Sequence, residues 1–199
     1  MSRRKSREQA FALLFEKSFN DLPVMDLAEG AQDAREFILE PFALALALSQ
    51  KLPHYDNYVK SGEYSAQDRF SNFDIPFYEL EGKTWGIVGM GNIGKRVARI
   101  ASAFGCKVIF HSVTGKSTVT EYPQVDKNTL LCESDFLSLH CPLSDLSRNF
   151  IDKDALAKMK PSAYLVNVAR GPVVNNTDLY EALESGKLAG AGLDVLEKE

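Results

Sequence analysis

The sequence contains few cysteines and no long apolar run. Its three cysteines, Cys106, Cys132 and Cys141, show no repeated spacing of the kind that builds a disulfide framework or a zinc site. Such sparse cysteines are typical of a reducing compartment, so we expect a cytoplasmic protein without a metal site. The longest apolar stretch, residues 42–48, is far shorter than the about 20 residues that span a bilayer, and no membrane partner is expected.

The excess of one sign of charge over the other is also small. The 199 residues carry a formal net charge of -4, so no overall positive field attracts nucleic acid or an anionic membrane. With 45% hydrophobic and 25% charged residues, the composition is that of an ordinary globular protein with one good core. A nucleic-acid partner is therefore not expected from the bulk numbers.

Two unlike pieces are joined in this chain. Residues 1–38 favour helices only, with Phe11, Leu14 and Phe15 at the spacing of one apolar stripe. From residue 39 to 199, apolar segments of strand length alternate with helical segments, the pattern of a parallel sheet covered on both faces. We predict an α/β fold: a Rossmann-like, doubly wound parallel sheet with an N-terminal helical appendage.

The second piece can be divided into elements. A helix is predicted to start at Pro41, which suits a first helical turn, and to end or kink at Pro53. An irregular stretch leads into the sheet. The predicted strands cover residues 84–88, 107–110, 135–140, 163–169 and 188–195, and the predicted helices cover 92–104, 125–134, 153–159 and 176–186.

A glycine-rich turn joins the first predicted strand to its helix. Gly89 permits a tight turn, Gly91 leaves room for a pyrophosphate, and Gly94 allows close packing of helix on sheet. The N–H groups of Asn92 and Ile93 then point at the phosphates from the start of the helix. In this strand–turn–helix setting the pattern predicts a dinucleotide site.

The end of the second predicted strand lacks the acidic residue that holds the ribose hydroxyls in an NAD site. Residues 111–117 carry small hydroxyls, including Ser112, and Lys116 instead. These side chains suit a 2′-phosphate, although Lys116 is equally compatible with a solvated loop. The cofactor is expected to be NAD or NADP, and the choice stays open.

Three segments carry a family resemblance: residues 82–105, 134–160 and 163–199, which include the runs NVARGPVV and GAGLDVLEKE. They resemble the NAD-binding domain of D-isomer-specific 2-hydroxyacid dehydrogenases, closest to the hydroxypyruvate and glycerate dehydrogenase types. The resemblance covers about residues 42–199. It implies NAD(P)-dependent hydride transfer at the CH–OH group of a D-2-hydroxyacid, with a small 2-oxoacid such as hydroxypyruvate or glyoxylate as the partner substrate.

The resemblance also implies residue roles. Arg170 would bind the substrate carboxylate, for which a planar guanidinium is well suited. Glu199 would hydrogen-bond the catalytic histidine and raise its pKa. Asp194 would hold the nicotinamide amide, and Cys141 and Pro142 would pack near the adenosine.

Other family features have no counterpart in the sequence. The family's acid–base histidine follows the glutamate, but the sequence ends at Glu199, and His140 is better explained as a packing or turn residue. No substrate domain is recognisable. We therefore expect cofactor binding with weak or absent turnover by this chain alone. A cofactor-binding module without catalysis is the alternative.

Two partner predictions remain. Residues 1–38 resemble the start of the transcription antitermination factor NusB, which implies RNA contacts by Arg3, Arg4, Lys5 and Arg7. An exposed amphipathic helix with a basic tail is the favoured alternative. The helix near 42–58 matches a family helix that forms a homodimer, and its apolar residues suit either that contact or burial within the domain.

Overall fold

A computed structural model describes residues 35–68, 72 and 75–196. The NusB-like segment up to residue 34, with the four basic residues predicted to contact RNA, lies outside the described residues, as does Glu199. The predictions about RNA contacts and about Glu199 therefore concern parts of the chain that the structure does not describe.

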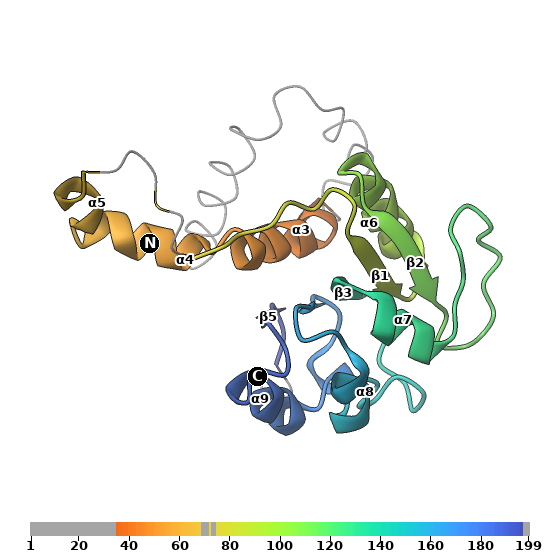
Figure 1. Ribbon diagram of the computed structural model, residues 1–199. Helices are drawn as coiled ribbons and strands as arrows, with labels where there is room; N and C mark the ends of the chain where they lie inside the picture. Colours follow the sequence, from red (N-terminus) through yellow and green to blue (C-terminus); the bar gives the residue numbers. More distant parts are fainter. Residues whose placement is uncertain (1–34, 69–71, 73–74, 197–199) are drawn as a thin grey trace.

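A five-stranded parallel sheet forms the centre of the fold (Figure 1). Its strands lie in the order β2-β1-β3-β4-β5, and every pairing is parallel. The strands are β1 (Thr84–Val88), β2 (Lys107–His111), β3 (Phe136–Leu139), β4 (Tyr164–Asn167) and β5 (Gly190–Leu193). All five predicted strands are confirmed, and the last three are shorter than predicted at both ends.

Strand β1 lies between β2 and β3, so the order of strands reverses there. In open α/β sheets such a point leaves a crevice at the carboxyl ends of the strands, and ligands bind in it. Beyond β2 the sheet gains one isolated parallel bridge, between Phe110 and Gln124. This bridge stands where a further edge strand of a doubly wound sheet would lie.

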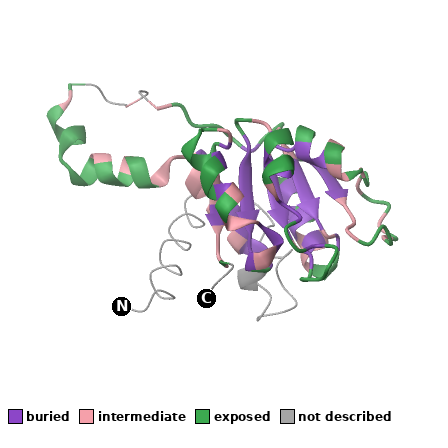
Figure 2. Cartoon of the chain, turned by 90° about the horizontal axis from the view of Figure 1, so that it is seen from below, coloured by how far each residue is buried: buried purple, intermediate pink, exposed green. Residues whose placement is uncertain are grey.

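Helices cover both faces of the sheet, as the doubly wound prediction requires. Helices α3 (Arg35–Ser49) and α6 (Asn92–Ala103) lie on one face. Helices α7 (Lys127–Glu133), α8 (Lys153–Lys158) and α9 (Asn176–Glu184) lie on the other, and a short 3₁₀ turn, η1 (Gly171–Val173), follows β4. Figure 2 shows the buried strands between partly exposed helices. The helices predicted after the glycine turn are confirmed.

Aromatic rings fill the core beneath α3 and α6. Phe42 stacks on Trp85 with ring centroids 4.4 Å apart, and Trp85 stacks on Phe136 at 5.3 Å. Phe136 in turn stacks on Tyr164 at 5.4 Å, so the row runs from α3 across β1, β3 and β4. Phe42 is only 1% exposed. Of the two alternatives for this residue, burial within the domain is therefore the correct one.

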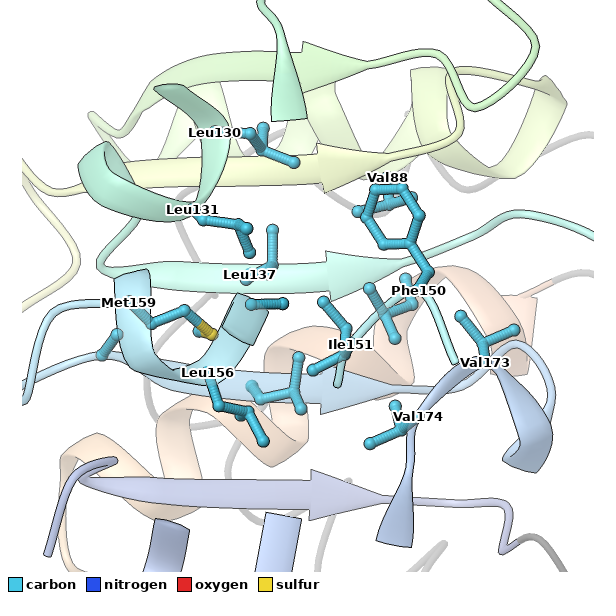
Figure 3. Packing of buried hydrophobic residues seen from close by; sticks show 14 of the residues in the cluster. Val88, Leu130, Leu131, Leu137, Phe150, Ile151, Leu156, Met159, Val173 and Val174 are labelled. Atoms are coloured by element: carbon cyan, nitrogen blue, oxygen red, sulfur yellow. The ribbon is translucent and has the colours of Figure 1, made fainter. Parts of the chain in front are cut away.

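Aliphatic side chains dominate the opposite face (Figure 3). Leu130 and Leu131 of α7 pack against β1 and β3, and Leu156 of α8 packs beside them. Gly86 makes this packing close, because a Cβ built there would lie 2.0 Å from Ser134 Oγ. The α7 layer therefore sits directly on the backbone of β1.

Helix α3 begins at Arg35, so the prediction that Pro41 starts the helix is wrong. Ile38 and Phe42 are buried in the core, and packing of this face stabilises the helix despite a proline inside it. The predicted boundary between residues 38 and 39 falls within this helix. At β5 the helix approaches closely, since a Cβ on Gly192 would lie 2.8 Å from Leu44 Cβ.

The helical conformation is interrupted after α3 at Lys51, whose φ of 55° is left-handed. Helix α4 (Leu52–Lys60) then starts with Pro53 in its first turn. The predicted interruption at Pro53 is therefore confirmed. Neither α4 nor α5 (Glu63–Ala66) has a buried residue, and the two form an arm that extends away from the sheet (Figures 1 and 2). No helix within the described ranges has the length and apolar character to cross a bilayer.

Candidate cofactor site at the carboxyl edge of the sheet

The predicted site residues follow the carboxyl ends of all five strands. In sheet order these are Ser112 after β2, Gly89 after β1, Cys141 after β3, Arg170 after β4 and Asp194 after β5. Neighbouring strands are about 4.8 Å apart, so four steps give a row about 19 Å long. The edge therefore suits an extended ligand that crosses the crevice between β1 and β3.

Two glycines of the turn after β1 are required by the fold. Gly89 has a φ of 93°, and a Cβ there would lie 2.9 Å from the carbonyl oxygen of His140. A Cβ on Gly94 would lie 2.2 Å from the carbonyl oxygen of Gly89. The turn is thus wedged between α6 and the end of β3, and its backbone is held by a 3.0 Å hydrogen bond from Gly89 N–H to the His111 carbonyl.

Gly91 differs from these two, because nothing lies within 4 Å of a Cβ built on it. It is the N-cap of α6, and no side chain caps the helix there. The first-turn N–H groups, including those of Asn92 and Ile93, have no acceptors within the helix and face an open approach. A helix start with free amides and the positive end of its dipole fits a pyrophosphate.

The turn after β2 is compact. Gly115 N–H donates to the Ser112 carbonyl oxygen at 2.9 Å, and Gly115 has a φ of 70°. Ser112 is half-buried, whereas Thr114 and Lys116 are exposed. The predicted hydroxyls and the lysine therefore share one tight turn beside the glycine turn.

His140 lies at the end of β3 against Gly89. Its Nε2 is 3.0 Å from Ser138 Oγ, which also accepts a 2.9 Å hydrogen bond from Trp85 Nε1. Burial lowers the pKa of His140 to about 4, so the ring is neutral at physiological pH. This agrees with the prediction of a packing role.

Cys141 and Pro142 continue the edge. Cys141 is 5% exposed, and burial raises the pKa of its thiol, so the side chain is a neutral apolar surface. Pro142 is exposed, and its carbonyl oxygen accepts a 2.7 Å hydrogen bond from the Ser147 hydroxyl. The Ser147 bond holds the loop after β3 in place.

Arg170 is exposed and extends from the end of β4. Its Nη1 donates to the carbonyl oxygen of Ala169 at 2.7 Å, which leaves other guanidinium donors for a ligand. Asp194 lies one strand away, and its backbone N–H donates to the Asn167 carbonyl oxygen at 3.0 Å. The two residues thus share one support, Asn167.

Asn167 was not among the predicted site residues. It is 1% exposed; its Oδ1 accepts from Ala169 N–H at 3.1 Å and its Nδ2 donates to the Arg170 carbonyl oxygen at 3.0 Å. Together with its backbone bond to Asp194, this makes Asn167 the fixed point from which both predicted ligand-binding residues extend. A polar residue that ends an otherwise apolar strand, as in YLVN, was the available signal.

Comparison with known proteins identifies the family. The model of the D-isomer specific 2-hydroxyacid dehydrogenase NAD-binding domain matches residues 42–199. The chain belongs to this family. A glyoxylate reductase of Thermococcus litoralis is 44% identical over 162 residues, which cover 79% of this chain and 49% of that protein.

Solved structures of relatives show the same fold. The D-lactate dehydrogenase of Aquifex aeolicus complexed with NAD and lactic acid has a TM-score of 0.72 and 34% identity, over 88% of this chain and 49% of that one. An acyclic imino acid reductase in complex with NADPH and D-Arg has a TM-score of 0.73 and 34% identity, over 80% and 50%. The chain spans about half the length of the relatives it matches.

Proposed function

We propose that this chain is the NAD(P)-binding part of an oxidoreductase that interconverts small D-2-hydroxyacids and 2-oxoacids. The observation that carries the proposal is the open position at Gly91, between two glycines that the fold requires. Family membership supports the cofactor class, and the glyoxylate reductase among the relatives supports the substrate class. The bound dinucleotide would supply or accept the hydride.

The residues of the edge would divide the binding between them. The first-turn amides of Asn92 and Ile93 would hold the pyrophosphate, and the turn at Ser112 would hold the adenosine ribose. Cys141 and Pro142 would offer an apolar surface to the adenosine. Asp194, on the far side of the crevice from Ser112, would bind the nicotinamide amide.

Arg170 would bind and orient the substrate carboxylate next to the nicotinamide. Its planar donors match a carboxylate bidentately, and the bond to the Ala169 carbonyl restricts the side chain before the ligand arrives. Glu199 follows Asp194 by five residues and would support the acid–base histidine that the family resemblance implies. Because the dinucleotide site belongs to residues from about 39 onward and helix α3 begins at Arg35, we propose that this domain binds cofactor without the residues that precede α3.

Calorimetric titration of the chain with NADH and NADPH tests the proposal. Wild-type protein is expected to bind at least one of them with a Kd below millimolar. In Gly91→Ala the added Cβ meets no protein atom but fills the approach to the helix start, so affinity should fall at least tenfold while the melting temperature stays unchanged. The absence of binding by folded wild-type protein would refute the proposed function.

Two further proposals concern the setting of the protein. We propose a cytoplasmic protein, supported by three cysteines that are all free. We also propose a homodimer through the helical region near residues 42–58, supported by helix α4, which has no buried residue and whose Val59 is 58% exposed. Light scattering should give twice the chain mass, and Val59→Asp should lower it; a concentration-independent monomer would disprove the dimer.

A further inference from the structure

We infer that the turn after β2 is a subsite for the 2′-phosphate of the adenosine ribose, so that the chain prefers NADP to NAD. The inference rests on the proposed function and extends it, because the family membership leaves the two cofactors open. It assigns the subsite to Ser112, Thr114 and Lys116. Its basis is the distribution of charge and hydroxyl groups at one end of β2.

The first observation is the absence of carboxylates from this part of the chain. Between Glu81 and Glu121 the sequence has no Asp or Glu, but it has six cations: Lys83, Lys95, Arg96, Arg99, Lys107 and Lys116. This span includes β1, the glycine turn, α6 and β2. A ribose 2′-hydroxyl of NAD is normally held by a carboxylate at the end of the second strand, and none is available there.

The nearest acids beyond the turn are otherwise placed. Asp126 caps α7, with Oδ1 accepting from the N–H groups of Asn128 and Thr129 at 2.8 and 3.0 Å and Oδ2 accepting from Thr129 Oγ1 at 2.6 Å. Glu121 is exposed in the loop after the turn. The Asp126 carboxylate is thus occupied by its bonds to α7. Glu121 is the one acid near the turn that the experiment must exclude as a ribose ligand.

The second observation is the geometry of the turn. Val88 pairs with His111 in the sheet, and Gly89 N–H bonds the His111 carbonyl, so the turn starts beside the pyrophosphate position. The Ser112–Gly115 hydrogen bond folds the turn back, and Lys116 N–H lies 3.4 Å from Thr114 Oγ1. Two hydroxyls and an ammonium group on one tight turn suit a dianionic phosphate.

A further cation lies close by. The Lys127 ammonium is 4.2 Å from the centroid of the Phe150 ring, and that ring is 5.7 Å from the ring of His111. Lys127 therefore adds positive charge at the carboxyl end of β2. Such a field favours the more highly charged of the two cofactors.

Calorimetry on the whole chain tests the subsite. Wild-type protein should bind NADPH at least tenfold more tightly than NADH, and adenosine 2′,5′-bisphosphate more tightly than 5′-AMP. Lys116→Ala should remove most of both preferences and leave the NADH affinity within twofold. Raising the salt concentration should reduce the preference, because the added contact is ionic.

Lys107→Ala is the matched control, since Lys107 is an exposed lysine at the opposite end of the same strand. It should change neither affinity. Ser112→Asp should shift the preference towards NADH by placing a carboxylate at the strand end.

Equal or tighter binding of NADH by wild-type protein would overturn the subsite and leave the proposed function standing. A preference for NADH that Glu121→Gln abolishes would also overturn the subsite and leave the proposed function standing. A preference for NADPH that survives Lys116→Ala would do the same. Binding of neither cofactor to folded protein would overturn both.

Discussion

At the scale of single residues, a few buried polar side chains organise the site. Asn167 joins the turn after β4 to the end of β5 by three hydrogen bonds, two from its side chain and one from its carbonyl. Ser138 joins Trp85 to His140 in the same manner. Ser138 lies inside an apolar strand and Asn167 ends one, and each supports a neighbour of the crevice.

Replacing Asn167 by Ala should lower the free energy of unfolding by about 2 kcal/mol, because the Ala169 N–H and the Arg170 carbonyl lose their buried partner. Urea unfolding followed by circular dichroism measures the change. Asn128→Ala is the control, since Asn128 is exposed and bonds only the Lys158 ammonium through its side chain. Equal effects of the two substitutions would argue against a supporting role for Asn167.

His140 predicts a dependence of stability on pH. Its pKa falls from 6.5 in the unfolded chain to about 4 in the fold because burial disfavours the charged ring. The unfolded state therefore binds the proton first, and stability is complete above about pH 6.5 and declines as the pH falls towards 4. The contribution is about 3 kcal/mol at most.

Urea unfolding at pH 7 and pH 4.5 measures this decline. The difference between the two pH values should be smaller in His140→Gln than in wild-type protein, because glutamine does not titrate. In NMR spectra the His140 ring should remain neutral at pH 5.5. A ring that titrates near 6.5 would contradict the buried, neutral state.

At the scale of elements, the glycine turn contains positions with opposite requirements. Gly94 meets the Gly89 carbonyl, whereas Gly91 faces open space. Gly94→Ala should therefore destabilise the protein by about 3 kcal/mol, since α6 must shift to relieve a contact between backbone atoms. Thermal denaturation should rank the variants with Gly91→Ala close to wild type. The reverse ranking would contradict the packing of α6 on the turn.

Prediction from the sequence succeeded where the pattern is local. Alternation of short apolar runs with amphipathic segments predicted all five strands, and the glycine spacing predicted the turn after β1. Pro41 was misplaced because a local rule for helix starts ignores the burial of Ile38 and Phe42 against the sheet. The role of Asn167 depends on a hydrogen bond from Asp194, 27 residues later in the chain and just after β5, and no local pattern contains that contact.

At the scale of the whole molecule, helix α3 connects the sheet to the exposed arm. Phe42 is its principal anchor, stacked on Trp85 and 5.8 Å from the ring of Phe104. Phe42→Ala should lower the free energy of unfolding by about 4 kcal/mol through the cavity it leaves. Phe77→Ala, at a residue that is 44% exposed, should have an effect below about 1 kcal/mol. Similar losses in urea unfolding would contradict the anchoring role of Phe42.

Trp85 is the only tryptophan of the chain, and it is fully buried. Its indole N–H is joined through Ser138 to His140, whose carbonyl lies against the glycine turn. The protein therefore carries an intrinsic fluorophore two hydrogen bonds from the crevice. Ligand binding in that crevice should change the tryptophan fluorescence without any added label. Entry of solvent into the interior should shift the emission maximum to longer wavelength.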